Sequence, residues 1–169
     1  MREFLAREPD LWFSVSATDR PPRPGEVDGR DYRFVSRAEF ERIRDEGGFL
    51  EWFEVYGDLK GTPRGPVEEH LAAGDDVLIE CDVQGALAIR AAFPRAFVVF
   101  VRAPSRTVQR DRLLGRDPHA DPEVLERRLE EADTEEQLAA EFDAVVVNDD
   151  VDRAVHEILT LLERERHEA

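Results

Sequence analysis

Short apolar segments alternate with helical patterns through the second half of the chain. The apolar segments lie at 77–81, 96–101 and 144–147, and a segment with helical periodicity follows each of them. Strands buried on both faces have this character, and helices between them connect them in parallel. The pattern predicts an α/β fold, a parallel sheet with helices on both faces. The helices are expected at 83–93, 105–114, 121–142 and 151–166.

The first half of the chain departs from this rhythm. An apolar segment at 11–16 ends in small polar residues and predicts a strand entering a loop, and alternation at 32–35 predicts a short strand. Residues 20–75 otherwise lack the strand–helix alternation. We interpret them as a small lobe inserted into a core of residues 1–19 and 76–169, all within a single domain.

Two helices are expected inside this lobe. Ser36 and Glu39 have the spacing of a capping box, which predicts a helix start, and Gly47 marks its end. A second helix is expected to have Pro63 at its first position and to end at Gly74.

Composition narrows the class of protein. The 169 residues are 41% hydrophobic, enough for a core, and carry a formal net charge of −16. Such a charge repels nucleic acid, so we expect no nucleic-acid partner and interpret the acidic excess as a solvated surface. No apolar run approaches the ~20 residues that span a bilayer, and charges interrupt the N-terminal segment, so no membrane partner is expected.

The chain has one cysteine, Cys81. One cysteine excludes an internal disulfide framework and suits the reducing cytoplasm, where we expect the protein to reside. Cys81 is either a buried structural residue or a nucleophile. The structural interpretation is favoured because no histidine lies near it in the sequence.

A basic segment stands out against the acidic background. Arg20 and Arg23 lie three residues apart among Pro21, Pro22 and Pro24. A guanidinium is planar and can donate to two phosphate oxygens at once, and prolines restrict the backbone around the two arginines. The segment therefore predicts a phosphate-binding loop.

Polar residues follow three of the predicted strands. Ser14 and Ser16 follow the first, Glu80 and Asp82 flank the end of the second, and residues 148–150 follow the last. Loop polarity explains any one of these groups. Because ligands bind at the carboxyl ends of strands in open parallel sheets, the three together favour a binding site.

Several motifs occur in one order along the chain. They are Ser14 to Tyr32, Phe49-Leu-Glu-Trp52, Gly61-Thr62, Cys81-Asp-Val-Gln-Gly85 and Val147-Asn-Asp-Asp150. In this order and at these spacings the sequence resembles guanylate kinases, from about Leu11 to the C-terminus. The resemblance implies a kinase of the P-loop type that transfers a phosphoryl group from ATP to GMP.

The resemblance also implies a GMP site. A carboxylate at Glu51 accepts from guanine N1–H and the exocyclic amine together, whereas adenine offers no such pair. The alternative is an ordinary surface glutamate, but a place between Leu50 and Trp52 favours partial burial. The implied GMP-binding residues are Ser16, Arg20, Arg23, Glu26, Tyr32, Glu51, Thr62 and Asp82.

The ATP side is implied by a second set of residues. Segment 115–123 resembles the kinase lid, Arg112, Arg116 and Arg128 match catalytic arginines, and Asn148 matches an ATP-binding position. The alternative for the nearby Arg110 and Arg127 is pairing with acidic neighbours on a helix surface. His119, inside the lid, is expected to face solvent.

The implied metal is Mg²⁺, which ATP carries in. Glu80 and Asp82 are expected to reach it through water. No His/Cys cluster has the spacing of a structural zinc site.

The sequence departs from the family at three positions and lacks one motif. Lys60 stands where the family commonly has tyrosine, Asp19 where it has threonine, and Asp117 where it has a lid glycine. A G-x-x-x-x-G-K-[ST] pattern, which holds the ATP phosphates, is absent. We expect that the chain is truncated within the helix after that loop and that its activity is impaired.

Two other functions remain open from the sequence. A guanylate-kinase-like binding module without catalysis is consistent with the absent loop, although the retained Arg20, Arg23, Glu51 and Asp82 argue against it. A different small-molecule kinase of similar fold is the second alternative. Glu51 together with Ser16 discriminates, because that pair specifies guanine.

Overall fold

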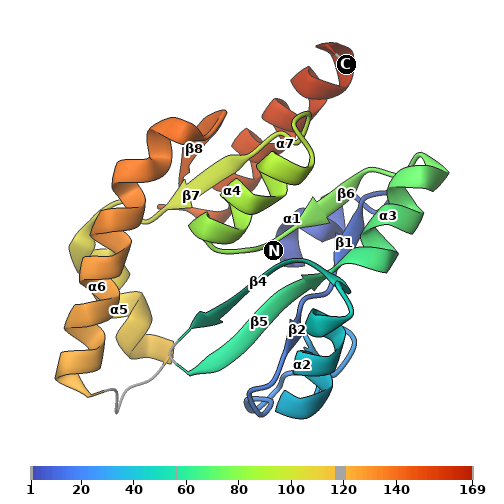
Figure 1. Ribbon diagram of the computed structural model, residues 1–169. Helices are drawn as coiled ribbons and strands as arrows, with labels where there is room; N and C mark the ends of the chain where they lie inside the picture. The colour runs from blue at the N-terminus through green and yellow to red at the C-terminus, as the bar shows by residue number, and fades with distance from the viewer. Residues whose placement is uncertain (1, 56, 117–120, 169) are drawn as a thin grey trace. The chain divides into compact units, whose positions relative to one another are not determined.

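The computed structural model describes residues 2–55, 57–116 and 121–168, and the chain divides into two compact units, residues 1–96 and 97–169 (Figure 1). The first unit contains α1 (Arg2–Arg7), β1 (Trp12–Ser14), β2 (Ala17–Thr18), β3 (Arg33–Phe34), α2 (Arg37–Asp45), β4 (Phe49–Val55), β5 (Asp58–Pro63), α3 (Arg64–Ala73), β6 (Val77–Ile79) and α4 (Val83–Ala92).

Two sheets form in the first unit. Strands β1 and β6 pair in parallel, so their carboxyl ends lie at the same edge. Strands β3, β2, β5 and β4 form a mixed sheet in that order, in which β4 and β5 are antiparallel. The chain passes from the first sheet to the second between Ser14 and Ala17, which places the loop after β1 beside both sheets.

A bulge in the β4–β5 hairpin determines which of its side chains lie on each of the two faces of the sheet. Phe49 pairs with Pro63 but Glu51 pairs with Thr62, so Leu50 is an extra residue in β4. Because side chains alternate along a strand, the bulge puts Phe49 on one face and Glu51 with Thr62 on the other.

The Phe49 face carries the core of this lobe. Phe49 clusters with Ala17, Phe40 and Leu59, all at most 5% exposed. The rings of Phe40 and Phe49 stack with centroids 4.4 Å apart. This packing fixes the hairpin against α2 and leaves its opposite face for polar residues.

The starts of α2 and α3 can be compared with the starts predicted from the sequence, and only the prediction for α2 is confirmed. The Ser36 hydroxyl accepts from the Glu39 amide at 3.2 Å and caps α2, as the capping box predicts. The expectation for Pro63 is wrong. Pro63 ends β5 and is the N-cap of α3, which begins at Arg64, because pairing with Phe49 holds Pro63 extended.

The second unit contains β7 (Val99–Arg102), α5 (Arg106–Arg116), α6 (Pro122–Gln137), a 3₁₀ turn (Leu138–Glu141), β8 (Ala144–Val147) and α7 (Val151–Glu168). Strands β7 and β8 pair in parallel over four residues. The alternation of strands and helices confirms the predicted α/β class. The predicted helix over 121–142 ends earlier, at Gln137, and continues as the 3₁₀ turn.

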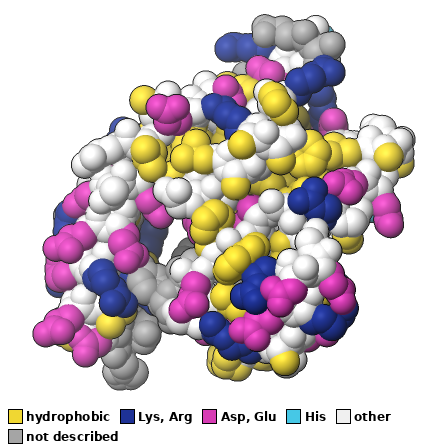
Figure 2. Space-filling model, viewed as in Figure 1, with side chains coloured by type: hydrophobic (Ala, Val, Ile, Leu, Met, Phe, Trp, Pro, Cys, Tyr) yellow, Lys and Arg dark blue, Asp and Glu magenta, His cyan; other side chains and the backbone are white. Residues whose placement is uncertain are grey.

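Charged side chains of both signs mix on the surface that Figure 2 shows. Arg42 on α2, for example, pairs with Glu39 and Glu46. In the described part of the chain, no helix combines the length and the apolar character that crossing a membrane requires.

Candidate functional site

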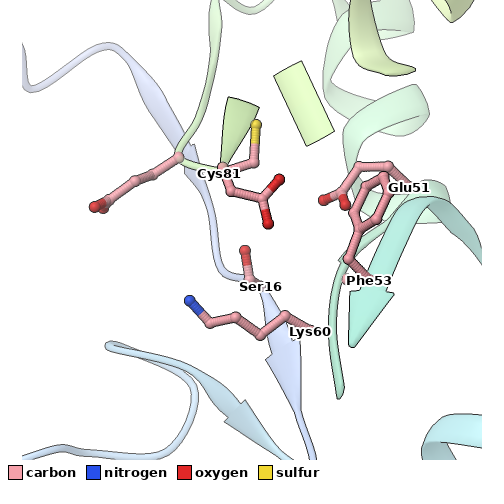
Figure 3. A pocket seen from close by; sticks show the side chains of 8 residues that line it. Ser16, Glu51, Phe53, Lys60 and Cys81 are labelled. Carbon is pink, nitrogen blue, oxygen red and sulfur yellow. The ribbon is translucent and has the colours of Figure 1, made fainter. Parts of the chain in front are cut away.

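A small pocket, open to solvent, lies in the first unit (Figure 3). The parallel pairing of β1 and β6 brings the segments after these two strands together, as the sequence predicts for Ser16, Glu80 and Asp82. The β4–β5 hairpin supplies the facing wall. The lining residues are Ser16, Glu51, Phe53, Lys60, Gly61, Glu80, Cys81 and Asp82.

Glu51 is the most deeply placed acid of this pocket. The residue is 9% exposed, and its carboxylate accepts a hydrogen bond from the hydroxyl of Thr62, which is fully buried. Burial raises the pKa of Glu51 above its usual value, the negative charge of Asp82 adds to the rise, and the Thr62 hydrogen bond opposes it. The pocket therefore presents a desolvated acceptor with few partners in the protein.

Replacing Glu51 is expected to stabilise the unliganded protein at neutral pH. A raised carboxyl pKa means that the folded state opposes ionisation, so this contribution to stability is present at low pH and is lost as pH rises through the raised pKa. Glu51→Gln removes the charge and keeps an oxygen for Thr62. Thermal melts should show a higher midpoint than wild type at pH 7, and the difference should shrink as pH falls through the raised pKa of Glu51, because the carboxyl group of the folded state then becomes protonated.

The start of α4 completes the wall beside Glu51. The Asp82 carboxylate caps the helix by accepting from the Gly85 amide at 2.7 Å. A Cβ on Gly85 would lie 3.0 Å from the Cys81 Cβ and 3.2 Å from a Glu51 carboxylate oxygen. Gly85 therefore allows the close approach of the two acids. Burial raises the pKa of the Cys81 thiol to about 12, which leaves it protonated and supports a structural role rather than a nucleophilic one.

Arg20 is held rigidly near the pocket. Its guanidinium donates two hydrogen bonds of 2.7 Å to the Glu26 carboxylate and lies 4.8 Å from the centre of the Tyr32 ring. Arg20 is 8% exposed. The Arg20 hydrogen bonds hold the pKa of Glu26 to about 2, so the pair stays ionised at neutral pH.

The other residues of the basic segment behave differently. Arg23 is exposed, and its backbone amide, not its side chain, bonds Glu26. Asp19, the carboxylate that stands where the family has threonine, accepts from the Leu59 amide at 2.6 Å and from Arg37 at 3.2 Å. Its side chain is only 6% exposed. Its charge is therefore engaged within the lobe.

The second unit holds the remaining candidates. Arg112 donates to the backbone oxygen of Asn148 at 2.8 Å. This hydrogen bond joins α5 to the loop that follows β8, through two residues that the sequence predicts for the site. The Asn148 side-chain oxygen is buried without a hydrogen-bond partner among the described residues, and Arg128 is half-buried on α6. The side chain of Arg116 and residues 117–120 of the predicted lid, with Asp117 and His119, lie outside the described residues.

Comparison with known proteins identifies the family. A family model described as guanylate kinase matches residues 2–165. A guanylate kinase of Rhodococcus jostii is 51% identical over 164 residues, which are 96% of this chain and 79% of that protein. A guanylate kinase of Gloeobacter violaceus is 52% identical over 162 residues, 96% of this chain and 78% of that protein. The chain belongs to the guanylate kinase family.

A solved structure agrees with this assignment. The crystal structure of guanylate kinase from Anaplasma phagocytophilum matches with a TM-score of 0.80 and 31% identity, over 96% of this chain and 81% of that one. The resemblance and the fold class that the sequence motifs predicted are thus confirmed.

Four residues line the pocket that the sequence analysis did not place there: Phe53, Lys60, Gly61 and Cys81. Gly61 is required by close packing, because a Cβ there would lie 3.0 Å from the Glu51 backbone oxygen and from the Trp52 Cβ. Its place in the Gly61-Thr62 motif of the guanylate kinase family was the available signal. Lys60 was identified from the sequence as a departure from the family, at a position where the resemblance implies that a cationic contact to phosphate replaces that of a tyrosine.

A Mg²⁺ ion fits this pocket only as a partly hydrated ion. Over the described ranges, no three His, Cys, Asp or Glu side chains are arranged so that they could hold a metal ion together. Glu80 and Asp82 both line the pocket, and one oxygen of Asp82 is engaged by the Gly85 amide. Two carboxylates suit an ion that keeps several waters and binds the phosphates of its nucleotide.

Proposed function

We propose that the protein transfers a phosphoryl group from ATP to GMP, giving ADP and GDP. The observation that carries this proposal is the buried Glu51 carboxylate, which Thr62 orients inside an open pocket. Guanine N1–H and its exocyclic amine form a pair of donors that match a carboxylate. Adenine lacks that pair, and a buried acceptor left unpaired opposes binding of the wrong base.

The residue roles in this proposal follow the chemistry of each group. Glu51, Thr62 and Ser16 bind the base, and Arg20, Arg23 and Tyr32 bind the monophosphate, with Glu26 orienting Arg20. Asp82 completes the GMP site. Arg112, Arg116 and Arg128 neutralise charge on the transferring phosphoryl group, and Asn148 contributes to ATP binding.

Mg²⁺ is proposed as the cofactor, held by ATP and by Glu80 and Asp82 through water. When bound, the ion neutralises charge on the phosphate oxygens. The protein residues position the acceptor phosphate, and no covalent enzyme intermediate is needed.

For a polypeptide that consists of these 169 residues alone, we propose that GMP binds but that phosphoryl transfer from ATP is slow. These residues contain no G-x-x-x-x-G-K-[ST] pattern. That loop supplies the backbone amides and the lysine that hold the ATP phosphates. A non-catalytic GMP-binding module is therefore the second candidate function for this polypeptide.

Calorimetric titration with GMP and AMP tests the proposal. GMP is expected to bind at least tenfold more tightly, the scale of one well-formed bidentate contact to a base. Equal affinities for the two nucleotides would contradict the guanine assignment. An assay for ADP release with ATP and GMP then separates the kinase from the binding module.

A further inference from the structure

Phe53 is the one aromatic side chain among the residues that line the pocket. The other seven lining residues are a glycine, a serine, a lysine, a cysteine and three acids. These groups suit the polar edges of a ligand, but they offer little apolar surface to a flat ring. Phe53 therefore supplies a kind of contact that the rest of the pocket lacks.

The Phe53 ring is not used by the core of the lobe. Phe53 is half-buried, and it lies outside the apolar cluster that Ala17, Phe40, Phe49 and Leu59 form. Among the described residues, Phe53 makes no ring-to-ring or cation–ring contact. An aromatic face without such a contact in the protein is available to a ligand in the pocket.

The backbone of β4 fixes where this ring lies relative to Glu51. Phe53 pairs with Lys60 and Glu51 pairs with Thr62, without a further bulge between the two pairs. Residues two apart on a strand share a face and lie roughly 6.8 Å apart along it. Figure 3 shows Phe53 and Glu51 extending from the same strand on the same side. The ring and the buried carboxylate therefore belong to one wall of the pocket.

This spacing suits a purine that Glu51 holds. The two hydrogen bonds between a carboxylate and guanine lie in the plane of the base, so the base continues from Glu51 into the pocket with its faces directed along the wall. Aromatic rings contact one another in offset or edge-to-face arrangements with centroids 4.5–7 Å apart. A ring roughly 6.8 Å along the strand from Glu51 is within that range.

We propose that Phe53 binds the purine ring of the nucleotide through an aromatic contact that does not depend on the identity of the base. This inference rests on the proposed function and adds a residue that the sequence motifs do not assign. Every base has an aromatic face, so such a contact strengthens the binding of all purines alike. Glu51 would then set the preference for guanine, whereas Phe53 sets the affinity that guanine and adenine share.

Phe53→Ala tests the proposal, because it removes the ring and leaves the polar groups of the pocket in place. Calorimetry should show that GMP, guanosine and AMP all bind about tenfold more weakly than to wild type, the scale of one contact between a base and an aromatic ring. The ratios of GMP to AMP affinity and of GMP to guanosine affinity should stay within about twofold of wild type. Phe53→Tyr should retain the wild-type affinities, since it keeps the ring.

Trp52→Ala is the matched control. Trp52 is the neighbouring aromatic residue of the same strand, but it lies on the opposite face, 42% exposed, with the Arg44 guanidinium 5.1 Å from its ring centre. Its removal should leave all three affinities within about twofold of wild type. Equal losses in Phe53→Ala and Trp52→Ala would overturn the aromatic contact. So would a loss in Phe53→Ala that is confined to GMP or that changes the ratio of GMP to AMP affinity.

Phe53→Trp provides a second readout that does not require removal of the ring. The sequence has two tryptophans, Trp12 and Trp52, so the emission of wild type serves as the reference. GMP and guanosine should each change the additional emission of the variant, and ribose 5-phosphate should not. If the variant binds GMP with no change in that emission, the aromatic contact is refuted.

The two proposals fail in distinguishable ways. If wild type prefers GMP to AMP but Phe53→Ala binds both as wild type does, the Phe53 contact alone is refuted. If wild type does not bind GMP, the proposed function fails as well.

Discussion

Glu51→Gln is expected to weaken GMP binding by about 1–3 kcal/mol, roughly tenfold to a hundredfold, and to leave AMP binding unchanged. The glutamine keeps one oxygen for Thr62 but presents an amide, which donates, where guanine also presents donors. The loss therefore falls on the base that the carboxylate recognises. Calorimetric titration of both nucleotides against wild type and variant measures it.

Glu54→Gln is the control for this prediction. Glu54 lies on the same strand, but its side chain is 55% exposed and pairs with Arg37. Its replacement should leave the GMP affinity within about twofold, because surface ion pairs contribute little. A similar loss of GMP binding in both variants, or an equal loss of GMP and AMP binding in Glu51→Gln, would contradict the role of Glu51 as a base-reading residue.

The strand-end part of the site was predictable from the sequence. Apolar segments at 11–16 and 77–81 predicted two strands, and parallel pairing puts their carboxyl ends together. The structure pairs β1 with β6 and brings Ser16, Glu80 and Asp82 to one pocket. Local pattern and a general rule of sheet geometry sufficed here.

The wall that carries Glu51 was not predictable from periodicity. Residues 49–55 read Phe-Leu-Glu-Trp-Phe-Glu-Val and show no clean alternation, because Leu50 is an extra residue in the strand. Residues 58–63 combine Asp, Lys, Gly and Pro, which are poor strand formers. Pairing between the two segments overrides these local preferences, so the hairpin and the orientation of Lys60 emerge only in the structure.

The basic segment was predicted as a phosphate-binding loop, and its two arginines differ in what surrounds them. Arg20 is buried against Tyr32 and Phe34 and bonded to Glu26, whereas Arg23 is exposed. The sequence shows two equivalent arginines three residues apart. Tertiary contacts make Arg20 part of the lobe's structure and leave Arg23 available to a ligand.

Arg20→Ala and Arg23→Ala are therefore expected to weaken GMP binding alike but to differ in stability. Each removes a charged phosphate donor, so GMP affinity should fall roughly tenfold to a hundredfold, with little change for guanosine. Arg20→Ala also leaves Glu26 without its partner, which should lower the free energy of unfolding by about 1–3 kcal/mol. Titration with GMP and guanosine, together with urea unfolding, separates the two effects.

Arg30→Ala controls for the loss of a charge from the same segment. Arg30 is exposed and pairs with its neighbour Asp31. GMP affinity and stability should both remain near wild type in this variant. The assignment of the phosphate to Arg20 and Arg23 requires that wild type bind GMP more tightly than guanosine. It also requires that this preference shrink in both alanine variants, because a preference that keeps its wild-type size after either substitution means that the phosphate is held elsewhere.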